Sequence, residues 1–341
     1  MMKILAIETS CDETALALLE AEGGLRAPKI RVKKNLVSSQ IAVHAPFGGV
    51  VPNLAKREHL KNLPVLFKEL LPRPARYTPD IIAVTVGPGL EPALWTGINF
   101  AKELHTTHFP KAKLVGTNHL EGHLASILLT SGVRRRPLHE LFPSIALLVS
   151  GGHTIILSMD SLVKWSMLGE TRDDAVGEAF DKVARILNLP YPGGPEVARL
   201  ATKGNPAAIP FPRPMLHDTS YDFSFSGLKT SVLYHRRDHP RASPADIAAS
   251  FEEAAIDALA GKVARALREY PTHSLLLSGG VAANRALRAR LAMLAKKHRI
   301  LFFAPPFAYN TDNAAMIGVA GYLTSLRGKR YPLRANGTLS L

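Results

Sequence analysis

Two histidines stand four positions apart in the segment Asn-His-Leu-Glu-Gly-His, at His119 and His123. On a helix this spacing puts both imidazoles on one face, where both can reach a single metal ion. A pair of partly buried helix histidines is the competing interpretation. Asp312 opens a further predicted helix, where its carboxylate can complete a metal shell or accept hydrogen bonds from the first helical N–H groups, and the two roles are compatible. Histidine and carboxylate ligands suit iron and zinc about equally, so the pattern leaves the metal open.

This spacing differs from the zincin motif of metalloproteases, in which a glutamate directly follows the first histidine. Here Glu121 lies two residues after His119, which turns it roughly 200° around a helix. A metalloprotease is therefore disfavoured.

Two apolar runs each end in Ser-Gly-Gly, namely LLVSGGHT at 147–154 and LLLSGGVAAN at 275–284. Glycine has no Cβ, so backbone N–H groups in such a turn can approach a phosphate. A solenoid repeat has a shorter period, whereas phosphate-binding turns that recur in one two-lobed body fit the wide separation. After the second run, Asn284 opens a predicted helix and is expected either to bond a nucleobase or to cap that helix.

Three carboxylates, Asp174, Glu178 and Asp181, fall on one face of a helix predicted over 172–187. Like charges on one stripe repel each other unless some partner donates hydrogen bonds to them. A ribose diol is one such partner, as in dinucleotide sites, and a solvated face is the alternative. The turn Tyr-Pro-Gly-Gly-Pro at 191–195 favours the ribose, because it can bring backbone against the sugar.

The elements that must position these residues alternate along the chain, as short apolar strands followed by helices. This alternation predicts an α/β fold. Strands are expected at 3–8, 81–86, 144–149, 274–277 and 300–303, and helices at 54–71, 92–107, 172–187, 246–269, 283–297 and 312–325.

We expect two lobes, at 1–135 and 136–311, with the C-terminal segment 312–341 as a candidate to pack back on the first. The basic, proline-containing segment RRRPLHELFP at 134–143 is the expected crossover between them. The irregular stretch 205–230 is too long for a simple linker, and loops of that length in a compact domain usually serve a site.

Composition points to a cytoplasmic protein with a polyanionic partner. The sequence has 42 Lys and Arg against 28 Asp and Glu, a net charge of +14, which favours binding to nucleic acid. No apolar run reaches the roughly 18 residues of a membrane helix, and the N-terminus turns acidic where a signal peptide would stay apolar. A single cysteine, Cys11, excludes an internal disulfide framework and suits a reducing cytosol. The positive charge is clustered in five runs, at 31–34, 134–136, 236–241, 296–299 and 327–334.

Nine motifs occur in order between residues 8 and 317, and together they closely resemble the TsaD family, formerly known as glycoprotease-like proteins. The motifs are ETSCDET, GGVVP with a following REH, GPGL, NHLEGH, LLVSGGHT, GEAFDK with YPGGP, DFSFSGLKT, SGGVAAN and TDNAAM. The resemblance implies an ASKHA fold, the duplicated actin-like and sugar-kinase-like α/β fold with a nucleotide cleft between two lobes. It also implies transfer of a threonylcarbamoyl group from threonylcarbamoyl-adenylate to the exocyclic amine of the adenosine beside the anticodon in ANN-decoding tRNAs, with release of AMP.

The resemblance assigns roles to individual residues. It implies one divalent metal ion, iron or zinc, held by His119, His123 and Asp312. We expect the metal to polarise the donor carbonyl and the Ser-Gly-Gly amides to stabilise the leaving AMP, with Glu13 and His153 as candidates for the base. The implied donor-binding residues are Leu148, Val149, Ser150, Gly151, Gly152, Asp181, Gly194 and Asn284.

The sequence departs from the family pattern at some positions, and two other functions are compatible with parts of it. Ala198 stands where many relatives carry an acidic residue, and Asn53 stands where the family usually has glutamate. Leu148 and His153 place the chain with the bacterial and mitochondrial branch, which implies protein partners similar to TsaB and TsaE. An ASKHA sugar or acetate kinase would share the fold, and a non-catalytic nucleic-acid scaffold would share the charge.

Overall fold

The computed structural model describes all 341 residues, and their contacts divide the chain into two units. Unit 1 comprises Met1–Leu138 and Pro305–Leu341, and unit 2 comprises His139–Ala304. The boundary at 138/139 falls within the segment RRRPLHELFP. The lobes expected at 1–135 and 136–311 stay a prediction.

Unit 1 is built on a five-stranded mixed sheet in the order β3-β2-β1-β4-β5. Its strands are β1 (Met2–Glu8), β2 (Glu13–Glu22), β3 (Lys29–Ser39), β4 (Ile81–Gly87) and β5 (Lys113–Asn118). Strand β1 pairs antiparallel with β2 and parallel with β4. Its apolar side chains alternate between the two faces, and the residues from Ile4 to Ile7 are fully buried because helices cover both sides.

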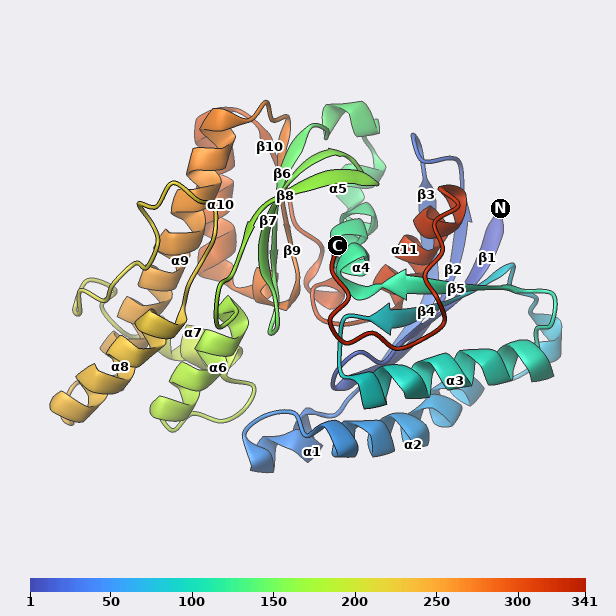
Figure 1. Cartoon of the computed structure of the whole chain (residues 1–341), viewed down its shortest axis with the longest axis horizontal. Coiled ribbons are helices and arrows are strands. Elements are labelled where there is room, and N and C mark those ends of the chain that lie inside the picture. Colours follow the sequence, from blue (N-terminus) through green and yellow to red (C-terminus); the bar gives the residue numbers. More distant parts are fainter. The chain divides into compact units, whose positions relative to one another are not determined.

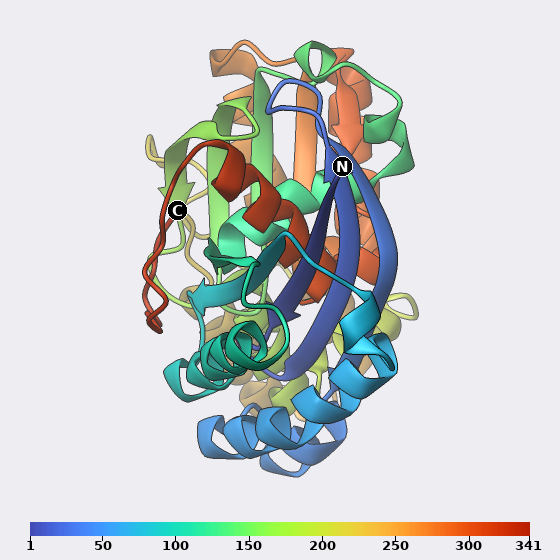
Figure 2. The same cartoon turned by 90° about the vertical axis from the view of Figure 1, so that its right-hand side faces the viewer.

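The helices of unit 1 lie on opposite faces of this sheet (Figures 1 and 2). Helices α2 (Pro52–Leu70) and α3 (Glu91–Thr107) pack against one face. Helix α11 (Ala314–Leu326) packs on the other face and against α4 (His119–Ala125). Gly318 permits this close approach, since a Cβ there would lie 2.3 Å from the Leu19 side chain. Two further helices are short, α1 (Ile41–His44) and α5 (Ser131–Arg134).

Unit 2 repeats the same sheet topology in the order β10-β9-β6-β7-β8. Its strands are β6 (Ser144–Val149), β7 (Thr154–Ser161), β8 (Lys164–Glu170), β9 (Ser274–Ser278) and β10 (Leu301–Phe303). Strand β6 pairs antiparallel with β7 and parallel with β9, so it corresponds to β1 of unit 1, and β9 corresponds to β4. The two units are therefore a structural duplication.

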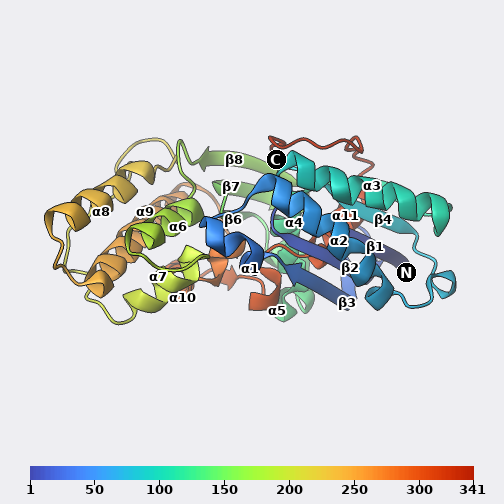
Figure 3. The same ribbon diagram turned by 90° about the horizontal axis from the view of Figure 1, so that it is seen from below.

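The helices of unit 2 share one apolar core with its sheet. They are α6 (Val176–Ile186), α7 (Gly193–Ala201), α8 (Ser226–Asp238), α9 (Pro244–Glu269) and α10 (Arg285–His298). Figure 3 shows α6, α7, α8 and α9 gathered beside the strands. Throughout the structure, no helix combines the length and apolar character that crossing a membrane requires.

All five strands and six helices expected from the sequence are present, but two boundaries were wrong. The helix expected from 172 begins at Val176, because Asp173 instead accepts hydrogen bonds from the backbone N–H groups of Phe225 and Ser226 and from the Ser224 hydroxyl. The last residues of the stretch 205–230 form the first turn of α8, which begins at Ser226. Hydrogen bonds therefore join the segment TRDD at 171–174 to the segment DFSFSGLKT at 222–230. Elements that were not expected are β2, β3, β5, β7, β8, α1, α5, α7 and α8.

Candidate functional site

The candidate metal ligands meet within unit 1. Strand β5 ends at Asn118, whose Oδ1 accepts hydrogen bonds from the N–H of Leu120 at 2.8 Å and of Glu121 at 3.3 Å, so α4 begins there. His119 and His123 follow on one face of this short helix, and Asp312 lies two residues before the start of α11. The three side chains converge although nearly 190 residues of sequence separate Asp312 from the histidines.

The distances between these side chains fit one shared metal ion. Asp312 Oδ1 lies 3.4 Å from His119 Nε2 and 3.2 Å from His123 Nε2, and one ligand atom from each residue falls within 4.8 Å of the others. Ligands about 2.0–2.1 Å from one ion, at angles near 90–109°, are themselves about 2.8–3.4 Å apart. Neither ring nitrogen of the fully buried His123 makes a hydrogen bond, although Asp312 Oδ1 lies 3.2 Å from Nε2. Such an orphaned donor set suits a metal better than it suits a structural histidine.

A second carboxylate orients the first histidine. Glu8 Oε2, at the end of β1, lies 3.1 Å from His119 Nδ1. The same carboxylate accepts hydrogen bonds from the Ser10 N–H at 2.5 Å and the Thr85 hydroxyl at 2.7 Å, so its position is fixed. With Nδ1–H facing Glu8, Nε2 is the ring nitrogen of His119 that lies toward Asp312 and His123, as in carboxylate–histidine–metal arrangements. The motif ETSCDET was noted in the sequence, but Glu8 itself was missed; its signal is a carboxylate ending a buried strand.

The positive charge of His119 and the negative charges of Asp312 and Glu8 stabilise one another. Burial opposes the imidazolium form of His119, but the carboxylates of Asp312 and Glu8 outweigh burial and raise its pKa well above the usual value. Burial likewise opposes the charged forms of Glu8 and Asp312, and the charge of His119 outweighs it and lowers both pKa values. For His123, burial lowers the pKa and so favours the neutral imidazole that a metal requires.

Two alternatives raised by the sequence are resolved by local contacts. Asn313, and not Asp312, caps α11, because its Oδ1 accepts a hydrogen bond from the Met316 N–H at 3.0 Å. The capping interpretation of Asp312 was therefore wrong, and its carboxylate faces the histidines instead. Glu121 is buried away from the ligands and bonded to Arg327, Lys329 and Tyr331, so it is not placed as a zincin glutamate.

Glu13 opens β2 after the turn that follows Glu8. Burial raises the pKa of its carboxyl well above the usual value, and the charges of Asp312 and Asp12 add to this effect. A carboxyl group with a raised pKa suits proton transfer near neutral pH. Burial also raises the pKa of the Cys11 thiol, so this cysteine is not an activated nucleophile.

His59, from the motif REH, supports the same turn. Its Nε2–H donates to the Cys11 carbonyl at 2.9 Å, and its Nδ1 accepts from the Thr14 hydroxyl at 2.8 Å, so the neutral ring uses both nitrogens. Burial lowers the pKa of His59. The unfolded chain therefore binds a proton at His59 more readily than the folded protein does. The stability that the neutral His59 contributes is complete above about pH 6.5 and is lost as the pH falls toward the pKa of the folded state. The free energy of unfolding changes by up to about 1.4 kcal/mol per pH unit in this range.

We expect His59→Gln to reduce the free energy of unfolding at pH 7.5 and to flatten its decline between about pH 6.5 and 5. Urea unfolding at stepped pH measures both effects. His217→Gln, at an exposed histidine, is the control and should keep the wild-type slope. An unchanged slope in His59→Gln would show that His59 does not couple protonation to folding.

The first Ser-Gly-Gly segment forms the turn between β6 and β7. The Ser150 N–H donates to the His153 carbonyl at 2.8 Å, and the His153 N–H donates to the Ser150 hydroxyl at 3.1 Å. Between them, a Cβ added at Gly151 or Gly152 would meet nothing within 4 Å, and the two N–H groups donate to no group of the chain. The turn thus presents free backbone donors to an anion.

The second Ser-Gly-Gly segment lies at the same edge of the sheet, because Leu148 on β6 is paired with Ser278 on β9. Gly279 has a φ of +92°, and a Cβ there would lie 2.2 Å from the Val149 carbonyl oxygen. Only glycine fits this close approach. The two Ser-Gly-Gly segments therefore lie next to each other in unit 2 and do not occupy equivalent positions of the two units. In unit 1, the segment that corresponds to the first is ETSCDET after β1, and the segment that corresponds to the second is GPGL after β4.

Helix α6 connects this turn to the expected ribose-binding residues. Its N-terminus approaches closely, since a Cβ on Gly177 would lie 2.5 Å from the Ser150 carbonyl oxygen. Further along α6, Asp181 Oδ1 accepts hydrogen bonds from the N–H groups of Gly193 at 2.8 Å and Gly194 at 3.1 Å. The structure therefore brings Asp181 and Gly194 together.

The other polar side chains singled out in this region, Asp174, Glu178 and Asn284, bind partners within the protein. The expected stripe of three carboxylates on one helix face was wrong in one member, because Asp174 lies before the first residue of α6. Lys182 is bonded to both Asp174 and Glu178, and Lys229 is bonded to Asp174. Asn284 caps α10 through the Leu287 N–H at 2.9 Å, while its Nδ2 donates to Glu252 at 2.6 Å.

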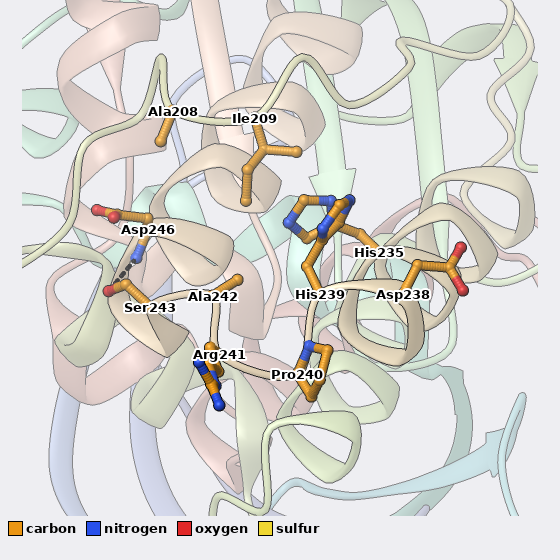
Figure 4. A pocket seen from close by; sticks show the side chains of 10 residues that line it. All are labelled: Ala208, Ile209, His235, Asp238, His239, Pro240, Arg241, Ala242, Ser243 and Asp246. Atoms are coloured by element: carbon orange, nitrogen blue, oxygen red, sulfur yellow. Dashed lines mark hydrogen bonds between the residues drawn. The ribbon is translucent and has the colours of Figure 1, made fainter.

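A separate pocket of about 580 Å³ lies where α8 ends and α9 begins (Figure 4). The stretch 205–230 contributes Ala208 and Ile209 to it, and the basic run 236–241 contributes Arg241. None of the expected donor-binding residues lines it. Within the same run, Arg236 donates a hydrogen bond to the Pro240 carbonyl and Arg237 forms an ion pair with Asp238. Both guanidinium groups therefore have partners within the chain.

The chain is similar to proteins of one family over most of its length. The sequence profile of the TsaD family, described as tRNA N6-adenosine threonylcarbamoyltransferase, matches residues 31–319. A protein of that name from Thermosipho melanesiensis is 47% identical over 94% of both chains, and one from Clostridioides difficile is 44% identical over 99% of this chain and 97% of its own.

Solved structures show the fold at low sequence identity. The nucleotide-bound full-length HypF is 13% identical with a TM-score of 0.60, covering 98% of this chain and 47% of HypF. The activator of the 2-hydroxyisocaproyl-CoA dehydratase from Clostridium difficile, solved with ADPNP, is 13% identical with a TM-score of 0.52, covering 96% of both chains. These neighbours confirm the expected two-lobed α/β fold of the ASKHA class. With the family profile matching most of its length and relatives matching nearly all of it, the chain belongs to the TsaD family.

Proposed function

We propose that the chain transfers a threonylcarbamoyl group from threonylcarbamoyl-adenylate to the exocyclic amine of the adenosine beside the anticodon in ANN-decoding tRNAs, and releases AMP. The observation that carries this proposal is the convergence of His119, His123 and Asp312 in a chain whose full-length relatives bear the name of this transferase. The reaction forms a carbamoyl C–N bond to adenine and breaks the anhydride C–O bond of the donor, and the proton leaves the attacking amine.

The proposed metal is one divalent iron or zinc ion, held by His119, His123 and Asp312. When bound, it supplies a Lewis acid that polarises the donor carbonyl. Glu8 keeps the Nδ1 proton on His119 and so presents Nε2 as the ligand atom. The matched distances and the orphaned ring nitrogens of His123 support this assignment.

The proposed donor site lies in unit 2. The free N–H groups of Gly151 and Gly152, together with the N-terminus of α6, are suited to hold the phosphate and to stabilise the AMP leaving group. Asp181 and Gly194 are adjacent and form the proposed ribose contact. The remaining members of the proposed donor site are Leu148, Val149, Ser150 and Asn284.

The exocyclic amine of adenine is a poor nucleophile and must lose a proton during the transfer. Glu13 and His153 both remain proposed bases. The raised pKa of Glu13, caused by burial and by Asp312, supports the first. The place of His153 beside the Ser-Gly-Gly turn supports the second.

The positive net charge of +14 supports tRNA as the macromolecular partner. We further propose that proteins similar to TsaB and TsaE assist the reaction and that it takes place in the cytoplasm, where tRNA is available.

The test is a reconstitution with chemically prepared threonylcarbamoyl-adenylate, unmodified ANN-decoding tRNA and the two partner proteins. Mass spectrometry of digested tRNA should show the modified nucleoside, with one AMP released per transfer. Formation of a phosphorylated small hydroxyl compound from ATP, without modified tRNA, would instead identify an ASKHA kinase. AMP release without modified nucleoside would reduce the activity to donor hydrolysis.

A further inference from the structure

Glu121 lies between the two metal histidines in sequence but is buried on another side of α4, with 5% of its surface exposed. Its carboxylate accepts hydrogen bonds from Lys329 Nζ at 3.0 Å, from the Tyr331 hydroxyl at 2.7 Å and from Arg327 Nη2. All three donors come from the C-terminal segment, residues 327–341. A buried carboxylate with one guanidinium, one ammonium and one hydroxyl partner is strongly localised.

The same C-terminal segment is also held by strands β4 and β5 and by the residue that caps α4. The Asn336 N–H donates to the Val86 carbonyl at 2.9 Å, and a Cβ on Gly116 would lie 2.8 Å from the Tyr331 carbonyl oxygen. Near the end of the segment, the Ser340 carbonyl accepts a hydrogen bond from Asn118 Nδ2 at 2.8 Å. Asn118 is the residue that caps α4, so the segment contacts both the cap and the middle of the metal-binding helix.

Helix α11 links these contacts to the third metal ligand. Asp312 stands before its first turn and Arg327 directly follows its last residue, Leu326. The helix lies against α4, since a Cβ on Gly122 would be 2.9 Å from the Ile317 side chain. One continuous stretch from Asp312 to Tyr331 therefore holds α4 on two sides, through the metal ligands on one and through Glu121 on the other.

We propose that Glu121 is a positioning residue for the metal centre, and that Arg327, Lys329 and Tyr331 act through it to set the metal affinity of His119 and His123. This inference rests on the proposed metal site. Helix α4 has only seven residues, too few to be stable without tertiary contacts. Its two ligands can keep their spacing to Asp312 only if the helix is held in place, because metal sites tolerate little misplacement of their ligands.

The test measures metal binding directly. Purified metal-free protein is titrated with Co²⁺, and the dissociation constant is obtained from the visible absorption of the bound ion and from competition with a chelator. We expect Glu121→Gln to weaken Co²⁺ binding by about 10-fold or more and to change the absorption spectrum, by analogy with the effect of lost outer-shell partners. Tyr331→Phe, which removes one hydroxyl and keeps the ring, should weaken binding several-fold in the same direction.

Asp222→Asn is the matched control. Asp222 is also a buried carboxylate held by an arginine, but it lies in unit 2 and pairs with Arg172. This variant should lose stability without any change in Co²⁺ affinity or spectrum. If Glu121→Gln does not fold, Tyr331→Phe decides the question.

Wild-type affinity and spectrum in the folded variants, with stability lowered as in the control, would make Glu121 a purely structural residue and overturn the proposal. If the wild-type protein binds no Co²⁺, or if His123→Ala leaves binding unchanged, the metal assignment itself is wrong and the positioning role is rejected with it. The His123 variant therefore separates the two failures.

Discussion

Replacing His123 by alanine is expected to leave a folded protein that neither retains metal nor transfers the threonylcarbamoyl group. His123 contributes one of three protein ligands, and losing a ligand should cost more than the roughly 10–100-fold in affinity that follows from losing an outer-shell partner. The fold should tolerate the change, because the two ring nitrogens of His123 make no hydrogen bond within the protein. Metal analysis of the purified variant, thermal unfolding without metal and the reconstituted transfer assay measure the three effects.

His105→Ala is a suitable comparison, since His105 also lies in a helix of unit 1 but belongs to no ligand set. That variant should keep wild-type metal content and activity. A His123→Ala protein with full metal content and full activity would show that His119 and His123 are not metal ligands but structural histidines of a helix. Loss of metal together with full activity would instead show that the ion is not used in the transfer.

The part of this site that could be predicted from the sequence is the part fixed by local geometry. A four-residue spacing on a helix places His119 and His123 on one face whatever the surroundings, and the structure has them there. Asp312 is remote in sequence, and its role as a ligand depended on family resemblance, because either metal binding or helix capping fitted its local pattern. The side chain of Asn313, one residue later, decided between them by taking the cap.

The errors arose where long-range contacts override local preference. Residues 172–175 carry a helical pattern, yet Asp173 is held by Phe225 and Ser226, some fifty residues away, and α6 starts only at Val176. Strand β8 was missed because it is partly exposed and lacks the continuous apolar run by which β6 and β9 were recognised. The two Ser-Gly-Gly segments looked like copies of one turn, but they end neighbouring strands of one sheet, and this pairing is a property of topology that spacing does not reveal.

Replacing Gly152 by valine is expected to leave the fold intact and to weaken binding of the adenylate donor by about 10–100-fold. A Cβ at this position would meet no atom of the protein within 4 Å, so stability should change little. The valine side chain would occupy the space in front of the free N–H groups of Gly151 and Gly152, and the lost phosphate hydrogen bonds are worth about 1–3 kcal/mol. Calorimetry with a non-hydrolysable threonylcarbamoyl-adenylate analogue measures the affinity, and thermal unfolding measures the stability.

Gly279→Ala provides the contrast that makes this result interpretable. At Gly279 a Cβ would lie 2.2 Å from the Val149 carbonyl oxygen and the φ of +92° is unfavourable for alanine, so this variant should unfold at a markedly lower temperature. If the open turn between β6 and β7 holds the donor phosphate, Gly152→Val should lose donor affinity while it keeps its stability. Gly279→Ala should lose stability, so a loss of donor affinity in that variant would not identify the phosphate site. Unchanged donor affinity in a folded Gly152→Val protein would mean that the phosphate is bound elsewhere, and that the free N–H groups of this turn only face solvent.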